Sequence, residues 1–270
     1  MIKLKITLTA ICLASSSAFA GPFILAGTDA DDHGFVSAGA NQQGWLFMQR
    51  ALENIGAGVS TSNMTVAILG STSSAASASN SAFDLSSLVG AGWSRSNIAT
   101  ASFADFFGGI GSVNINNVGI LIMDSGGNVG GGVNGSAFVP YASTINSFVG
   151  GGGGLFSQAN GYAWLTALLP AVLITGESSQ GISLTAAGNA AFPGLTNADL
   201  SAGPYHNRFN NFSPIPTLGT SNATGEAIII GGTGGSITDP GNSVPEPASL
   251  ALLGVGLMGL AAAHRRKQNS

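Results

Sequence analysis

Val118-Gly119-Ile120-Leu121-Ile122-Met123, followed directly by Asp124, is the strongest strand pattern in the sequence. A short continuous apolar run that ends at a polar residue is typical of a strand buried on both faces. Two more runs of this kind occur earlier, at 23–26 and 66–69, and each is closed by a glycine. Buried strands of this type predict a sheet that is covered by helices on both sides.

A helical pattern lies between the first two predicted strands. The apolar positions that recur at helical spacing are Trp45, Met48, Leu52 and Ile55, with Gly56 as the predicted end of the helix. A strand, a helix and a second strand at this spacing form a βαβ unit, in which the two strands are parallel. The sequence therefore predicts an α/β fold with a doubly wound, mostly parallel sheet.

The remaining segments continue the alternation of strands and helices. Helices are predicted near 83–90, 138–148 and 162–169. Strands are predicted at 97–102, 155–157, 171–175, 182–186 and 226–230. The Ser-, Ala- and Asn-rich residues 71–81 are predicted to form a surface loop, and 126–135 a glycine-rich loop.

Both ends of the chain have the composition of targeting segments. Lys3 and Lys5 precede an apolar stretch, and Ala18-Phe19-Ala20 is a small-x-small cleavage site. This pattern predicts a cleaved signal peptide over 1–20. We then expect an α/β domain over 21–230, a Gly/Ser/Pro linker over 231–243 and a separate C-terminal segment over 244–270.

The C-terminal segment has three parts in a fixed order. Pro245-Glu246-Pro247 is followed by the apolar run 248–263, and then by Arg265, Arg266 and Lys267. Proline disfavours helix in the residue before it, so a helix can begin only near Ala248. Sixteen helical residues span about 24 Å, and flanking basic side chains can reach past the ends of such a segment. We therefore expect a single transmembrane helix with the basic cluster on the cytoplasmic side. A buried helix of the domain core is the alternative.

This tail resembles the PEP-CTERM sorting signal, which in Gram-negative bacteria that make exopolysaccharide is recognised by a membrane-embedded exosortase. The residues that carry the resemblance are Pro245, Glu246, Pro247, the apolar run, Arg265 and Arg266. The resemblance implies export, anchoring in the inner membrane through the C-terminal helix, and later transfer to the cell surface or extracellular matrix. An exosortase-type enzyme is then the expected partner.

The charge of the domain limits its partners. Residues 21–243 contain three arginines and no lysine against eleven acidic residues, a net formal charge of −8. Nucleic acids and anionic membrane surfaces are poor partners for such a domain. Cys12 is the only cysteine and lies in the predicted signal peptide, so the mature chain has no disulfide and no cysteine nucleophile. The weakly charged polar composition suits a matrix of polysaccharide.

The middle of the chain resembles the class I glutamine amidotransferase-like fold, and within it the ThuA-like branch. The segments that carry the resemblance run from 25–29 through 122–127, 152–157, 192–195 and Tyr205-His206 to the closing strand. Amidotransferases carry a cysteine at the elbow between strand and helix, where this sequence has Ser157. The resemblance therefore implies the fold but not the cysteine chemistry.

Polar residues follow three of the predicted strands. Asp29, Asp31 and His33 come after the first strand, Asp124 ends the central strand and Ser157 ends the next. In a parallel sheet these ends share one edge, where ligands bind in folds of this class. Asp29, Asp31 and Gly34 match positions of an EF-hand, but His33 and Ala40 do not, so an EF-hand is excluded. A looser divalent-cation site and a solvated acidic loop both remain open.

Ser157 and His206 are candidates for a nucleophile and its base. The sequence has no Gly-x-Ser-x-Gly elbow, because Leu155 and Ala159 flank Ser157. His206 joins the edge only if the amidotransferase-like resemblance holds. These features favour a noncatalytic envelope or matrix protein that binds polysaccharide or a partner. A metal-assisted, hydrolase-like enzyme on the amidotransferase-like scaffold is the alternative.

Overall fold

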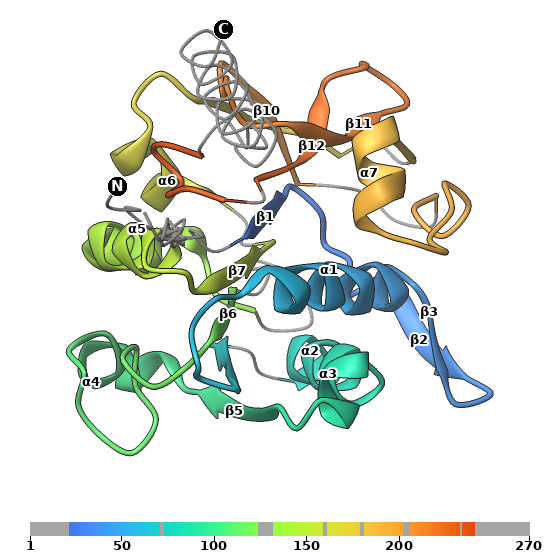
Figure 1. Ribbon diagram of the computed structural model, residues 1–270. Helices are drawn as coiled ribbons and strands as arrows, with labels where there is room; N and C mark the ends of the chain where they lie inside the picture. The colour runs from blue at the N-terminus through green and yellow to red at the C-terminus, as the bar shows by residue number, and fades with distance from the viewer. Residues whose placement is uncertain are drawn as a thin grey trace, which may run out of the picture.

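A computed structural model describes residues 22–70, 73–123, 132–158, 161–178, 181–201, 206–232 and 234–240. A central sheet runs through the molecule, with helices on both of its sides (Figure 1). The predicted signal peptide, membrane helix and basic tail lie outside the described residues. Within the described part, no helix is long and apolar enough to cross a membrane.

The sheet has ten strands and two halves of different character. The first half is parallel and has the order β5 (Ser94–Ile98), β4 (Thr65–Leu69), β6 (Ile120–Met123), β7 (Gly154–Ser157) and β1 (Phe23–Ala26). The second half is antiparallel and adds β12 (Ala227–Gly232), β10 (Asn207–Asn210), β8 (Leu173–Gly176), β11 (Thr217–Ser221) and β9 (Ile182–Leu184). The predicted α/β fold with a large sheet around a parallel core is confirmed.

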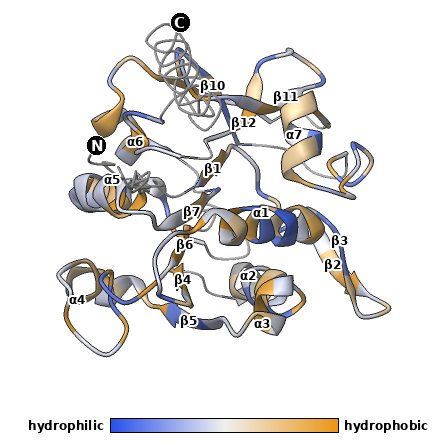
Figure 2. Ribbon diagram, in the orientation of Figure 1, coloured by the Kyte–Doolittle hydropathy of each residue, from blue (hydrophilic) through white to orange (hydrophobic). Residues whose placement is uncertain are grey.

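The strands β4, β6, β7 and β1 of the parallel half are buried on both faces, as their apolar runs predict, whereas the edge strand β5 is polar and largely exposed. Along β6, Leu121 and Met123 pack into one core, while Ile120 and Ile122 pack into the other. Successive side chains of a strand point to opposite faces, so a continuous apolar run serves both cores. Figure 2 shows these hydrophobic strands between helices that carry both polar and apolar residues.

Helices cover each face of the sheet (Figure 1). One side carries α1 (Gly44–Gly58), α2 (Ser73–Asp84) and α3 (Ser87–Gly90). The other side carries α4 (Phe103–Phe107) after the 3-10 turn η1 (Thr100–Ser102), then η2 (Gly135–Tyr141), α5 (Ala142–Gly150) and α6 (Ala163–Leu168). The short helix α7 (Ala186–Ala191) packs on β11.

The predicted surface loop over 71–81 is wrong, because residues from Ser73 onward form α2. Ala78, Ala82 and Phe83 of this helix are buried against the core that also holds α1. Alanine is the best helix former, and the Ala-rich sequence needs only this packing to become helical. Serine and asparagine composition alone therefore suggested the wrong local structure.

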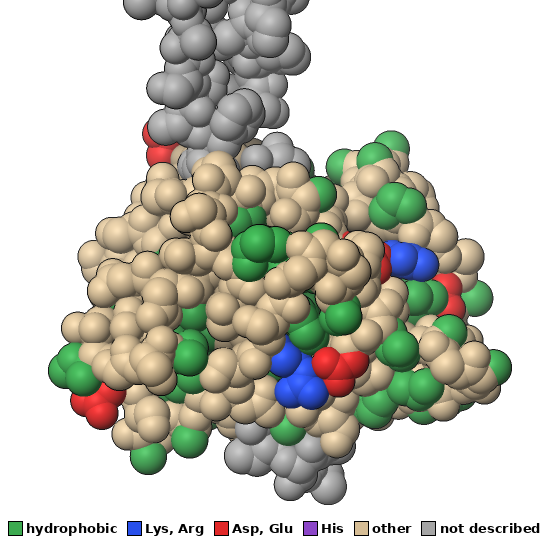
Figure 3. Space-filling model, turned by 60° about the horizontal axis from the view of Figure 1, so that its bottom comes forward, with side chains coloured by type: hydrophobic (Ala, Val, Ile, Leu, Met, Phe, Trp, Pro, Cys, Tyr) green, Lys and Arg blue, Asp and Glu red, His purple; other side chains and the backbone are tan. Residues whose placement is uncertain are grey.

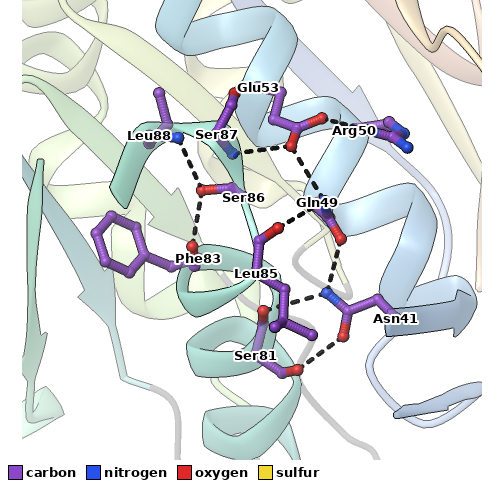
Figure 4. A network of polar contacts seen from close by, with 10 residues as sticks. All are labelled: Asn41, Gln49, Arg50, Glu53, Ser81, Phe83, Leu85, Ser86, Ser87 and Leu88. Carbon is purple, nitrogen blue, oxygen red and sulfur yellow. Dashed lines mark hydrogen bonds and ion pairs between the residues drawn. The ribbon is translucent and has the colours of Figure 1, made fainter. Parts of the chain in front are cut away.

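A polar network joins α1 to α2 and α3 (Figure 4). Gln49 accepts a hydrogen bond from the Asn41 amide (2.9 Å) and donates to the Leu85 carbonyl (2.9 Å) and to Glu53 (3.0 Å). Glu53 also accepts from the Ser87 backbone N–H (3.0 Å) and pairs with Arg50 (2.6 Å). Burial acts to raise the pKa of Glu53, but the hydrogen bonds from Gln49, Arg50 and Ser87 outweigh it and lower that pKa.

Several elements were not predicted from the sequence. They are the hairpin of β2 (Gly34–Ser37) and β3 (Ala40–Gln43), the helix α7, and the strands β10 and β11. The helix α1 runs past Gly56, which lies inside it instead of ending it. The packing of the domain continues past 230, since β12 ends at Gly232 and Ile237 is buried.

Candidate functional site

The candidate site lies where the chain leaves β1 and β7 and enters β10. Gly27, just after β1, accepts hydrogen bonds from the backbone N–H groups of His206 (2.7 Å) and Asn207 (3.1 Å). A β-carbon on Gly27 would lie 1.8 Å from the Asn207 carbonyl oxygen, so only glycine permits this close approach. The crossing brings His206 beside the residues that follow β1, although about 180 positions separate them in the sequence.

Asp29 lies between two histidines. Its Oδ2 atom is 3.1 Å from His33 Nε2 and 3.5 Å from His206 Nε2. The Asp29 side chain is buried, whereas His33 and His206 retain 31% and 29% of their side-chain exposure, so both rings reach solvent. Burial raises the pKa of the Asp29 carboxyl, while the two histidines act in the opposite direction. The order of strand ends predicted Asp29 and His33 here, and His206 joins them.

A small cleft of about 20 Å³ opens beside this cluster. Its lining consists of Thr28, Asp29, Ala30, His33, Gly44, Ile182, Asp199 and Leu200. That volume holds roughly one water molecule. Among the described residues, the lining carries two carboxylates and no arginine, so it disfavours anionic ligands.

The Asp31 side chain makes a buried polar contact at the same edge of the sheet. Its Oδ1 atom accepts a hydrogen bond from Gln158 Nε2 (3.3 Å), and its backbone carbonyl accepts from Trp45 Nε1 (2.7 Å). Gln158 Oε1 in turn accepts from the Thr28 hydroxyl (3.4 Å). Sequence reasoning did not single out Gln158 and Thr28 as site residues, because neither side chain carries charge.

Ser157 lies at this edge but is fully buried. Its backbone carbonyl and that of Ala26 both accept from the Tyr162 hydroxyl, at 2.8 and 2.7 Å. Burial raises the pKa of Tyr162 far above its ordinary range, so the phenol stays protonated as the donor. A buried serine does not fit a nucleophile that has to meet a substrate from solvent.

Asp124, the fourth predicted metal ligand, lies outside the described residues. Within the described part of the chain, no group of three or more histidine, cysteine, aspartate or glutamate side chains is arranged to hold a metal ion. Of the predicted ligands, Asp29 and His33 are in contact, while Asp31 contacts Gln158. The geometry therefore supports Asp29 with its two histidines as the polar centre of the site.

The three arginines of the domain are all in ion pairs. Arg50 pairs with Glu53, Arg95 with Asp84, and Arg208 with both Glu177 and Glu226. On the face of the molecule shown in Figure 3, charged side chains are few and the basic ones lie beside acidic ones, while uncharged polar groups and backbone dominate. The arginines within the described part of the chain therefore form no basic patch of the kind that binds nucleic acid.

Comparison with known proteins identifies one segment of the chain. Residues 243–267 match the family model of the PEP-CTERM protein-sorting motif. No curated protein and no solved structure matches the chain, so no family or structural match supports the amidotransferase-like resemblance. The motif, which an exosortase recognises, indicates a protein that is exported and processed by this membrane enzyme.

Proposed function

We propose that this protein is delivered by its C-terminal tail to an exosortase and then serves in the cell envelope or extracellular matrix. Its α/β domain acts there as a noncatalytic binding or structural module associated with exopolysaccharide. In this proposal, residues 1–20 are a cleaved signal peptide and 248–263 hold the chain in the inner membrane until sorting. The match of residues 243–267 to the sorting motif carries the proposal.

The chemistry of the domain supports a neutral, hydroxyl-rich partner. Every arginine of the domain is already paired with a carboxylate, and the cleft beside Asp29 is lined by two carboxylates, one histidine, one threonine and four apolar or glycine residues. Sugar hydroxyls both donate and accept hydrogen bonds, so carboxylates, histidines and amides can bind them without a cationic side chain.

Replacement of Pro245, Glu246 and Pro247 by alanine tests the proposal. The variant should remain unprocessed in the inner-membrane fraction of the native host, whereas the parent chain reaches the surface or matrix. Alanine at Gly241 and Asn242, just before the matched segment, is the control and should be sorted normally. Equal distribution of the alanine variant and the parent would contradict the proposal.

A hydrolase-like activity is the second candidate, and the Asp29–His33–His206 cluster is the observation that favours it. A carboxylate that accepts from Nε2–H fixes the tautomer of a histidine, in which Nδ1 carries the lone pair of a base. Two such histidines can act as base and acid in one hydrolytic step. Purified protein would be assayed with chromogenic ester and glycoside substrates. Turnover that His206→Gln abolishes and Arg95→Gln leaves intact would support catalysis.

A further inference from the structure

Thr28 and Gln158 form a buried side-chain pair across 130 positions of sequence. The Thr28 hydroxyl lies 3.4 Å from Gln158 Oε1, and the two residues retain only 5% and 1% of their exposure. Thr28 follows β1 and Gln158 follows β7, so the pair spans the carboxyl ends of two neighbouring parallel strands. Asp31, also 1% exposed, contacts the amide nitrogen of Gln158 at 3.3 Å.

We propose that Thr28 and Gln158 become joined by an intramolecular ester bond. The Thr28 oxygen attacks the side-chain carbonyl carbon of Gln158, a new C–O bond forms, and the C–N bond breaks. The hydroxyl proton ends on the departing nitrogen, which leaves as ammonia. The reaction needs no oxidant, reductant or further reactant, and the chain becomes lighter by one ammonia.

The surroundings of the pair supply what this slow reaction requires. The fold holds the Thr28 hydroxyl beside the Gln158 amide, 3.4 Å from its Oε1 atom. Such proximity turns a bimolecular step into a unimolecular one, and well-oriented groups reach effective molarities on the order of 10⁵ M or more. The Asp31 carboxylate, which accepts a hydrogen bond from Gln158 Nε2, is the catalytic residue that takes up the hydroxyl proton and passes it to the leaving nitrogen. Burial of all three side chains limits the access of the bulk water that would hydrolyse the ester.

Backbone contacts hold the reacting groups in place. The Gln158 N–H donates to the Met123 carbonyl (2.9 Å) at the end of β6, and the Trp45 indole donates to the Asp31 carbonyl (2.7 Å). The product ties β1 to β7 covalently in the middle of the sheet. An exported domain that contains neither cysteine nor lysine between 21 and 243 can form no disulfide or lysine isopeptide, so an ester is the cross-link open to it.

Peptide mapping of the full-length protein tests the proposal. Arg50, Arg95 and Arg208 are the only tryptic sites between 21 and 243, so trypsin separates Thr28 from the peptide 96–208 that contains Gln158. We expect the two peptides to remain joined, lighter by one ammonia, and to separate on treatment with hydroxylamine, which cleaves esters. Two separate peptides of unmodified mass would overturn the proposal, whatever any variant shows.

Substitutions then assign the roles. Thr28→Val removes the nucleophile, and Asp31→Asn removes the carboxylate that relays the proton; the first should abolish the joined peptide and the second should reduce it at least tenfold. Thr166→Val, at an exposed threonine, is the control and should keep the joined peptide.

Loss of the link should lower the Tm by roughly 10 °C, as loss of a long-range cross-link does. A joined peptide that persists in Thr28→Val would contradict the assignment. Sorting does not depend on the link, so this test is independent of the proposed function.

Discussion

Asp29 shows how a single residue can serve a site and weaken a fold. Its carboxyl is buried and burial raises its pKa, so folding makes the ionisation of this group less favourable than in the unfolded chain. A group of this kind stabilises the fold below its ordinary pKa, and this contribution is lost as the pH rises through the raised value. Residues that are retained although they lower the stability of the fold are typical of functional sites.

We therefore predict that Asp29→Asn unfolds at a higher temperature than the parent at neutral pH. The gain should be on the order of 1 kcal/mol and should disappear below about pH 4, where the carboxyl is protonated in both states. Thermal melts between pH 3 and 8 measure the difference. A variant that is less stable than the parent at neutral pH would show that the contacts with His33 and His206 outweigh the cost of burial.

Glu53 is the opposite case, since its hydrogen bonds lower its pKa. Its contribution to stability is present above the ordinary glutamate pKa and is lost as the pH falls through the lowered value. Glu53→Gln should cost roughly 1–2 kcal/mol at pH 7, because several hydrogen bonds to a charged acceptor are weakened.

Urea denaturation at pH 7 and pH 3 checks this prediction, and Asp105→Asn, at an exposed position, is the control. The cost of Glu53→Gln should shrink at pH 3. An equal cost at both pH values would assign the effect to packing instead of charge.

At the scale of elements, a substitution in the strand β6 tests whether this strand lies in the core. Ile120 is fully buried between β4 and β7, where a charge has no partner. Ile120→Asp should cost several kcal/mol and unfold a domain of ordinary stability. Ile110→Asp is the matched control, since Ile110 is 60% exposed and should tolerate the charge. Circular dichroism of the two variants decides the matter, and a folded Ile120→Asp variant would remove β6 from the core.

The elements that the sequence predicted are those whose pattern depends on burial alone. The apolar runs at β1, β4, β6 and β7 and the helical face of α1 could be predicted because both report the position of the core. The polar strand β10 and the Ser-rich helix α2 could not, because tertiary contacts decide their structure. The hairpin of β2 and β3 is likewise polar and projects from the body of the molecule (Figure 1).

The candidate site could likewise be predicted only where its residues follow an apolar, buried strand. Asp29 and His33 follow a recognisable strand, so the rule for parallel sheets placed them at one edge. The crossing at Gly27 that brings in His206 depends on β10, which the sequence pattern does not show. The Thr28–Gln158 pair depends on the register of β1 with β7, a property of the assembled sheet.

At the scale of the whole molecule, charge separates the parts of the chain. The domain keeps three arginines, all paired, while the other five basic residues lie within 1–20 and 264–270. A basic end beside an apolar run is the pattern that membrane insertion machinery reads. In the proposed function, the two ends of the chain therefore carry the instructions for export and sorting, and the domain is what is delivered.

The central claim is that this delivery depends on the sorting motif at 243–267. The most direct test is the mass and terminal sequence of the protein recovered from each fraction of the native host. We predict that the parent chain outside the inner membrane begins near Gly21 and lacks the tail. The Pro245, Glu246 and Pro247 alanine variant should instead stay in the membrane with its tail intact to Ser270. Identical termini and identical fractions for the two chains would contradict the claim.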